Sequence, residues 1–243
     1  MAETITVQET GKRLAKGIRD GTPIALGYFP VSFTFGILAA SYGFSWWEAT
    51  LISMLSLTSA GQFAGLGIMA SGGSLLEMAL SQLVINLRYS LMSISLSQKV
   101  DRTVRGLYRW ILAFGNTDEI FAVAMSQQGS VSRRYLFGLI LLPFLGWSSG
   151  TLCGAVLGAI LPARLESALG IAIYGMFIAI LVPAAKKSRP VLMVVAIAAL
   201  LSCLFNYMPG LNRISSGFTI IICSIMASAV GALLFPVKKE EDE

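Results

Sequence analysis

Long apolar stretches separated by short polar gaps run through almost the whole chain. A helix needs about 20 mostly apolar residues to cross the hydrocarbon core of a bilayer. Five uncharged stretches meet this requirement alone, and a sixth is assembled across Arg88. We therefore predict six full transmembrane helices, at residues 22–42, 77–96, 138–160, 167–185, 190–207 and 214–236.

Two further segments are long enough to span a membrane but have an unsuitable composition. Residues 49–73 contain Ser-Leu-Thr-Ser-Ala-Gly-Gln-Phe-Ala-Gly at 56–65, whose glycines and hydroxyl groups make a poor lipid-facing helix. Residues 110–127 contain Asn-Thr-Asp-Glu at 116–119. Two adjacent carboxylates are costly at mid-membrane unless they face protein or water. We predict that both segments are broken helices.

The basic residues indicate how these two segments enter the membrane, because cytoplasmic loops are enriched in Lys and Arg. If the N-terminus is inside and both broken segments return to the side from which they came, every basic cluster is cytoplasmic. If both segments cross, the chain has eight full spans and the basic loop 99–109 moves outside. We favour six spans with two re-entrant segments and keep eight spans as the alternative. The clusters are at residues 12–19, 99–109, 133–134, 186–189 and 238–239.

Composition and charge support an all-α polytopic membrane protein. Charged residues make up 13% of the chain, about half of the roughly 25% found in soluble domains, and the mean hydropathy is +0.73. We predict a single transmembrane transporter domain over 21–237 and a charged cytoplasmic tail over 238–243. Residues 1–20 form either a basic amphipathic helix at the cytoplasmic surface or a basic tail without regular structure.

Several function classes are excluded by what the chain lacks. The sequence has no histidine, which removes imidazole metal sites, Ser/His and Cys/His dyads, and histidine proton relays. The low charge argues against a water-soluble enzyme or a nucleic-acid binder, although the formal net charge is +5. We expect no enzymatic activity, no metal, no cofactor and no nucleic-acid partner.

The broken segments are the candidate substrate site. Irregular backbone at membrane depth is tolerated where it lines a cavity, and half-helix N-termini in transporters bind anionic groups. Such a site suits a free amino acid, with an apolar pocket for its side chain. Alternatively, Gly61 and Gly65 form only a helix-packing contact. The candidate substrate-binding residues are Ser59, Gly61, Gln62, Phe63, Asn86, Arg88, Asn116, Thr117 and Phe121.

Three charged residues need partners at this depth. Arg88 is always ionised, so it either pairs with Asp118 or Glu119 or extends to a nearby membrane surface. Asn116 and Glu119 have the spacing of a variant capping box. Alternatively, Asp118 and Glu119 load and release a proton during transport, because partial burial makes a carboxyl group easier to protonate.

A stripe of glycines predicts close helix packing. Four glycines recur at every fourth position in one span and form a flat groove for another helix. The spacing does not say whether that helix belongs to this chain or to another. The stripe consists of Gly146, Gly150, Gly154 and Gly158.

Three motifs resemble the AzlC family in order and spacing, and the resemblance covers essentially the whole chain. They are Ser-Ala-Gly-Gln-Phe-Ala from Ser59, Ile-Asn-Leu-Arg-Tyr-Ser-Leu-Met-Ser from Ile85, and Thr-Asp-Glu-Ile-Phe-Ala from Thr117. The family comprises large subunits of prokaryotic branched-chain amino acid exporters. The resemblance implies export driven by the ion-motive force together with a small AzlD-like membrane subunit.

We therefore expect a multi-pass protein of the prokaryotic cytoplasmic membrane with both termini in the cytoplasm. The alternative is a passive channel or permease subunit for small solutes, although the scarcity of charge at depth argues against ion conduction. An intramembrane enzyme is disfavoured, because the adjacent Asp118 and Glu119 project in different directions on a helix. A scaffold for the partner subunit would leave the polar residues at depth unexplained.

Overall fold

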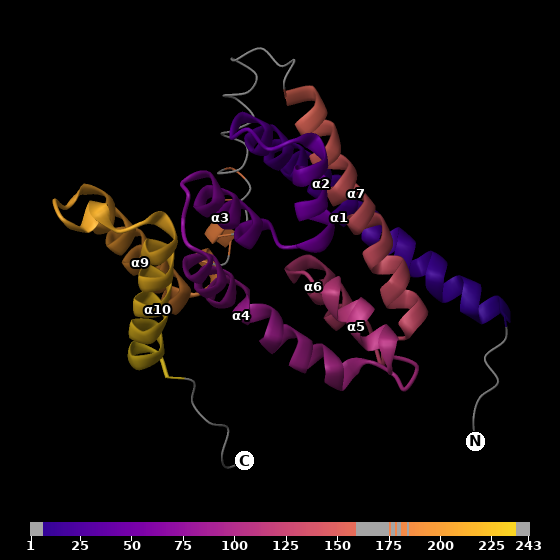
Figure 1. Ribbon diagram of the computed structural model, residues 1–243. Coiled ribbons are helices and arrows are strands. Elements are labelled where there is room, and N and C mark those ends of the chain that lie inside the picture. The colour runs from indigo at the N-terminus through magenta and orange to yellow at the C-terminus, as the bar shows by residue number, and fades with distance from the viewer. Residues whose placement is uncertain (1–6, 159–174, 176–177, 179–180, 184, 237–243) are drawn as a thin grey trace. The chain divides into compact units, whose positions relative to one another are not determined.

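The computed structural model describes residues 7–236 except 159–174, 176–177, 179–180 and 184. The described part is helical apart from short turns and one isolated bridge, between Val100 and Val131 (Figure 1). The predicted all-α membrane fold is confirmed. The predicted span 167–185 lies mostly outside the described residues, and the predicted tail 238–243 lies wholly outside them.

Four helices are long and apolar enough to cross a membrane, and each matches a predicted span. They are α1 (Val7–Ser41), α7 (Arg133–Gly158), α9 (Arg189–Tyr207) and α10 (Ser216–Leu234). Helix α4 (Leu75–Lys99) corresponds to the predicted span across Arg88. It is continuous over 25 residues, which is long enough to cross, but its serines and Arg88 make it less apolar than the other four. A short 3-10 turn, η1 (Leu211–Arg213), lies between α9 and α10.

Both segments with unsuitable composition are broken. Helices α2 (Trp46–Leu55) and α3 (Ser59–Ala70) are separated at 56–58, and α5 (Leu107–Phe114) and α6 (Asp118–Ser126) are separated at 115–117. Each half-helix has 8 to 12 residues, or about 12–18 Å of axial length. A single half-helix is therefore too short to cross a hydrocarbon core of about 30 Å.

The described residues form two compact units. The first contains residues 7–62 and 86–158, and the second contains 63–85 and the described part of 173–236. In the second unit α9 packs on α10. Gly65 of α3 lies against the Met78 side chain of α4, as the packing interpretation of this glycine expects. Ser215 Oγ and the Gly217 backbone N–H, at the start of α10, donate to the buried carboxylate of Glu77 across 2.5 Å and 3.0 Å.

Helices α1 and α7 form the main packing interface of the first unit. A Cβ atom added to Gly150 or Gly154 would overlap the backbone of α1, so these helices approach too closely for a larger residue. The glycine stripe therefore packs within this chain. Helix α1 has matching glycines, Gly17 and Gly36, which meet the backbone of α7. The helices run parallel, because Gly146, Gly150, Gly154 and Gly158 meet Ala25, Phe29, Phe33 and Ile37 in the same chain order.

The beginning of the chain differs from the expectation. Residues 7–20 neither form a helix of their own nor a tail without structure, because they are the first turns of the 35-residue helix α1. Gly17 lies against Tyr135, and Gly138 lies against the backbone of Leu14. The apolar face of this segment therefore packs on the beginning of α7 instead of lying alone on the membrane surface.

Helices α5 and α6 form a hairpin whose two ends lie together. The Asp101 N–H donates to Val131 O across 3.0 Å, and the Val131 N–H donates to Lys99 O across 2.9 Å. The Lys99 ammonium group also donates to Met125 O, near the end of α6. The residues before α5 and the residues after α6 therefore lie side by side, as the two ends of a re-entrant segment do. The hairpin is held by apolar packing of Leu112, Ile120, Ala124, Leu136 and Leu139.

The parallel arrangement of α1 and α7 bears on the span count. Parallel helices that both cross the membrane are separated by an odd number of crossings. If α5 and α6 return to their starting side and α4 crosses once, an odd number of crossings requires that the segment 49–73 also returns. This geometry favours the six-span arrangement, although the span count itself stays a prediction because residues 159–174 are not described.

Candidate functional site

The break between α5 and α6 lies well inside the first unit. At the base of the hairpin, Lys16 of α1 donates to the Gln127 side chain. At its tip, Tyr28 of α1 contacts Thr117 and Glu119. Lys16 and Tyr28 are twelve residues apart, which corresponds to about 18 Å along α1. This distance is about half the thickness of a hydrocarbon core of about 30 Å, so a base at the membrane surface would place the tip near mid-membrane.

Arg88 and Asp118 form an ion pair at this tip, with Arg88 Nη1 and Asp118 Oδ2 2.9 Å apart. The Arg88 side chain is 42% exposed and that of Asp118 is 44% exposed. Arg88 also donates to the Tyr89 hydroxyl across 3.3 Å. It precedes Lys99 by eleven residues, or about 16 Å along α4, so the structure places it at the tip and not at the end of the helix. Its Nε atom is buried without a hydrogen-bond partner among the described residues.

Glu119 has a different kind of partner. The Tyr28 hydroxyl lies 2.5 Å from Glu119 Oε2 and 2.7 Å from Thr117 Oγ1. Among the described residues no cation lies within ion-pair distance of Glu119. The two adjacent carboxylates are thus held differently, Asp118 by a permanent charge and Glu119 by a neutral hydroxyl group.

The predicted capping box at this tip is wrong. The N-cap residue of α6 is Thr117, and no side chain caps the helix. Asn116 precedes the cap, and its Nδ2 atom donates to Ser93 Oγ of α4 across 3.3 Å. Glu119 is consequently the second helical residue, and its carboxylate turns to Tyr28.

The break between α2 and α3 is held by two sets of hydrogen bonds. Thr58 Oγ1 donates to Asn86 Oδ1 of α4 across 2.8 Å. Gln62 accepts from Trp147 Nε1 across 3.1 Å and donates to Ser53 Oγ across 2.5 Å. Ser53 Oγ lies 2.6 Å from Thr151 Oγ1. Gln62 is only 3% exposed, so its amide fixes the break to α7 and is not open to a substrate.

Trp147 connects the two breaks within the first unit. Its indole ring meets the ring of Tyr28 edge-on, with ring centroids 5.3 Å apart and an interplanar angle of 75°. Because Trp147 holds Gln62 of one break and packs on Tyr28, which holds Glu119 of the other, the two tips share one scaffold on α1 and α7. We call the residues Tyr28, Gln62, Arg88, Asp118, Glu119 and Trp147 the tip cluster.

The other predicted site residues lie near the breaks in different settings. Ser59 is half-buried and Gly61 is buried at the start of α3. Phe63 is half-buried in the second unit. Phe121 packs against the apolar residues of the hairpin. The sequence analysis missed Tyr28, Thr58, Ser93 and Trp147. The tyrosine and tryptophan carried a usable signal, because a buried Tyr O–H or Trp N–H usually finds a hydrogen-bond partner.

The sequence model of the family described as AzlC protein matches residues 23–161, which include both breaks and the whole tip cluster. The chain belongs to the AzlC family. Family membership supports a transporter-type role for this chain.

The relatives that match this chain are membrane proteins. An uncharacterized membrane protein of Archaeoglobus fulgidus is 37% identical over 173 residues, covering 70% of this chain and 75% of the relative. The inner membrane protein YgaZ of Escherichia coli is 30% identical over 195 residues, covering 77% and 79%. An uncharacterized membrane protein of Helicobacter pylori is 27% identical over 154 residues, covering 59% and 65%. No solved structure matches this chain.

Proposed function

We propose that this AzlC-family chain is the large subunit of a secondary transporter that exports branched-chain amino acids across the cytoplasmic membrane. It works with a small AzlD-like subunit and is driven by the proton-motive force. The family membership supports a transport role, and the tip cluster supports the choice of a zwitterionic cargo.

The observation that carries the proposal is the Arg88–Asp118 ion pair at the tip of a re-entrant hairpin. Ionised residues at membrane depth cost stability and usually mark substrate or ion pathways. An amino acid presents one carboxylate and one ammonium group. It can therefore exchange partners with the pair, its carboxylate binding Arg88 and its ammonium group binding Asp118, without leaving a charge uncompensated.

In this mechanism, protonation of a carboxylate at the tip couples amino acid export to the proton gradient. A proton that binds Asp118 or Glu119 removes one negative charge and changes how strongly the tip holds Arg88 and Tyr28. Only a ligand or proton with different affinities for the two conformations can shift their populations. The proton-loaded tip therefore favours one orientation of the site, and the deprotonated tip favours the other.

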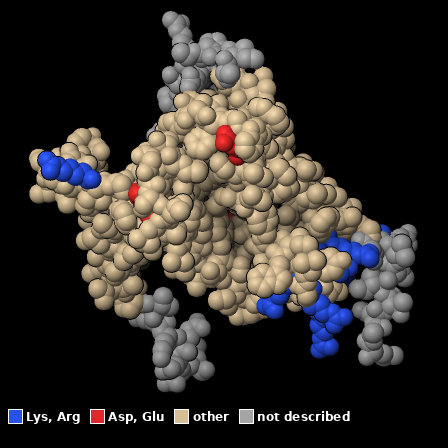
Figure 2. Space-filling model, viewed as in Figure 1, with Lys and Arg blue, Asp and Glu red and all other residues tan. Residues whose placement is uncertain are grey.

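The charge distribution supports an orientation with the beginning of α1 in the cytoplasm. At the base of the hairpin the Lys16 and Lys99 ammonium groups donate to Gln127 Oε1 and Met125 O, and the Arg133 backbone N–H donates to Thr103 Oγ1. Apart from Arg88, which lies at the tip, the Lys and Arg side chains of this unit that are visible in Figure 2 gather at that end. Under the positive-inside rule this end faces the cytoplasm, and we propose that the C-terminus lies on the same side.

The decisive experiment is export from cells loaded with hydrophobic dipeptides, with and without co-expression of an AzlD-like subunit. We expect efflux of leucine, isoleucine and valine only when both subunits are present, and loss of efflux when the proton gradient is collapsed. Asp101→Asn is a suitable control for charge removal, because Asp101 lies in the basal loop and asparagine also supports its turn. Non-saturable flux without counterflow would instead identify a passive channel.

A further inference from the structure

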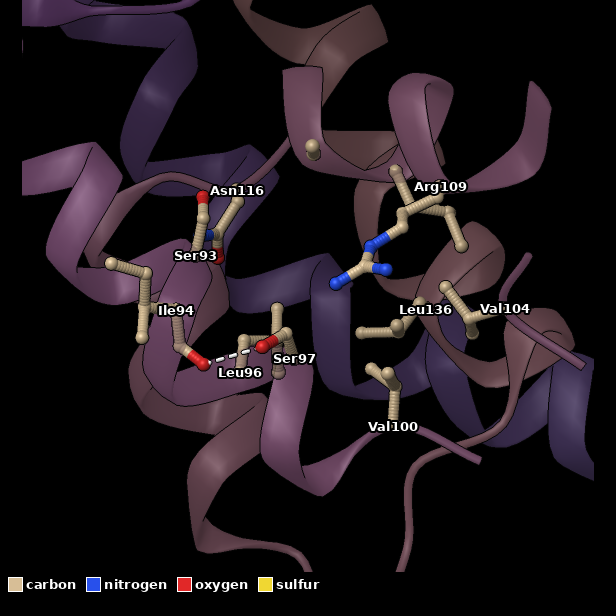
Figure 3. A pocket seen from close by; sticks show the side chains of 11 residues that line it. Ser93, Ile94, Leu96, Ser97, Val100, Val104, Arg109, Asn116 and Leu136 are labelled. Carbon is tan, nitrogen blue, oxygen red and sulfur yellow. Dashed lines mark hydrogen bonds between the residues drawn. The ribbon is translucent and has the colours of Figure 1, made fainter. Parts of the chain in front are cut away.

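A cavity of about 230 Å³ lies between the second half of α4, helix α5 and the beginning of α7 (Figure 3). Its walls are mainly aliphatic. Its volume is below the range of about 300–1,000 Å³ that is typical of pockets for drug-sized ligands, so it suits a smaller molecule. The apolar walls include Leu96, Val100, Val104, Leu112 and Leu136.

One end of the cavity presents hydrogen-bond acceptors. Asn116 is only 4% exposed, and its Oδ1 atom has no hydrogen-bond partner among the described residues. Ser97 donates its hydroxyl proton to Ile94 O across 2.6 Å, which leaves its oxygen free to accept. A buried acceptor without a partner is unfavourable. An ammonium group, which only donates hydrogen bonds, is the natural ligand for this end.

Arg109 supplies the opposite charge. It lies in the first turn of α5, and its guanidinium group extends over the cavity in Figure 3. No carboxylate lies within ion-pair distance of Arg109 among the described residues. A guanidinium group binds carboxylates and phosphates through paired hydrogen bonds.

We propose that this cavity is the cytoplasmic loading site for the exported amino acid, an inference that rests on the proposed export function. Arg109 binds the carboxylate, Asn116 Oδ1 and Ser97 Oγ accept from the ammonium group, and Leu96, Leu112 and Leu136 contact the branched side chain. Because Asn116 adjoins the N-cap of α6, the loaded amino acid lies next to the hairpin tip. The phosphate of phosphatidylglycerol would satisfy Arg109, but this lipid carries no ammonium group for the two acceptors.

The test is leucine binding to the purified transporter in lipid nanodiscs, with its small subunit where required. Arg109→Gln should weaken leucine binding at least about tenfold, the loss expected for one charge-assisted contact, and Arg109→Lys should restore part of it. Arg105→Gln is the matched control, because Arg105 lies four residues earlier and does not line the cavity. Arg109 is exposed, so its replacement leaves the core intact.

Two further measurements test the geometry. Leucinamide lacks the carboxylate, so its binding should be weak and should not weaken further in Arg109→Gln. Ala113 is an exposed residue at the cavity wall. Ala113→Leu should narrow the cavity and reduce leucine binding more than alanine binding.

The outcomes separate the loading site from the function. Unchanged leucine binding and export in Arg109→Gln and Ala113→Leu would overturn the loading site and leave the exporter intact. Loss of phosphatidylglycerol binding without loss of leucine binding in Arg109→Gln would make Arg109 a lipid contact and would overturn the loading site. A wild-type protein that neither binds nor exports any branched-chain amino acid would overturn both proposals.

Discussion

Arg88 in the middle of α4 and Asp118 at the first residue of α6 form an ion pair of 2.9 Å between a continuous helix and the tip of a re-entrant hairpin. The pair joins two elements that approach the break from different parts of the chain. A change in the charge of Asp118 is therefore transmitted directly to α4.

Asp118→Asn should abolish gradient-driven export while the protein remains folded, because the amide keeps the size of the side chain but cannot bind a proton. Both side chains are more than one-third exposed, and the asparagine oxygen can still accept a hydrogen bond from Arg88, so we expect the fold to be retained with a moderate fall in melting temperature. Export would be measured beside exchange of labelled for unlabelled leucine. Gradient-driven export at the wild-type rate in Asp118→Asn, and also in Glu119→Gln, would reject proton coupling through these carboxylates.

Gly154→Leu should separate α1 from α7. It should lower the free energy of unfolding by about 1–3 kcal/mol, the usual cost of overpacking. A Cβ atom at this position already overlaps Phe33 O, and the backbone cannot move away as a side chain could. The melting temperature in detergent is the measurement. Gly27→Leu is the control, since nothing lies within 4 Å of a Cβ atom there. Equal melting temperatures for the two variants would mean that the close α1–α7 contact does not exist.

Gln62→Leu and Trp147→Phe should each destabilise the protein by about 1–3 kcal/mol, because each leaves a buried polar partner unsatisfied. The double variant removes both partners of the 3.1 Å hydrogen bond. It should therefore cost less than the sum of the two single changes. Thermal unfolding of the wild type, the two single variants and the double variant gives the double-mutant cycle that measures this coupling. Strict additivity would show that the two side chains do not interact.

A cysteine at position 103 should be protected from a membrane-impermeant thiol reagent added to intact cells and should become reactive after permeabilisation. Thr103 lies in the loop at the base of the hairpin, which faces the cytoplasm in the six-span arrangement. The variant is made after Cys153, Cys203 and Cys223 have been replaced by alanine. Ser71→Cys, in the turn between α3 and α4, serves as the exposed comparison. Rapid labelling of position 103 in intact cells would support eight spans.

The sequence by itself determined which parts of the chain enter the membrane and where helices break. Hydropathy and length identify α1, α7, α9 and α10 because an apolar helix of sufficient length has few alternatives in lipid. The runs at 56–65 and 116–119 predict breaks because lipid offers no partners for exposed polar groups. The four-residue spacing of the glycine stripe likewise predicts a close helix–helix contact, because this spacing alone places the glycines on one face of the helix.

Only the tertiary structure decided which partner each polar group takes. Asp118 and Glu119 are neighbours in sequence, but they point about 100° apart on a helix, so one meets Arg88 and the other meets Tyr28. Trp147 meets Gln62, 85 positions earlier in the chain, and the Val100–Val131 bridge joins the two ends of the hairpin. Composition acts locally and sets what can be buried, whereas these pairings depend on how distant helices pack.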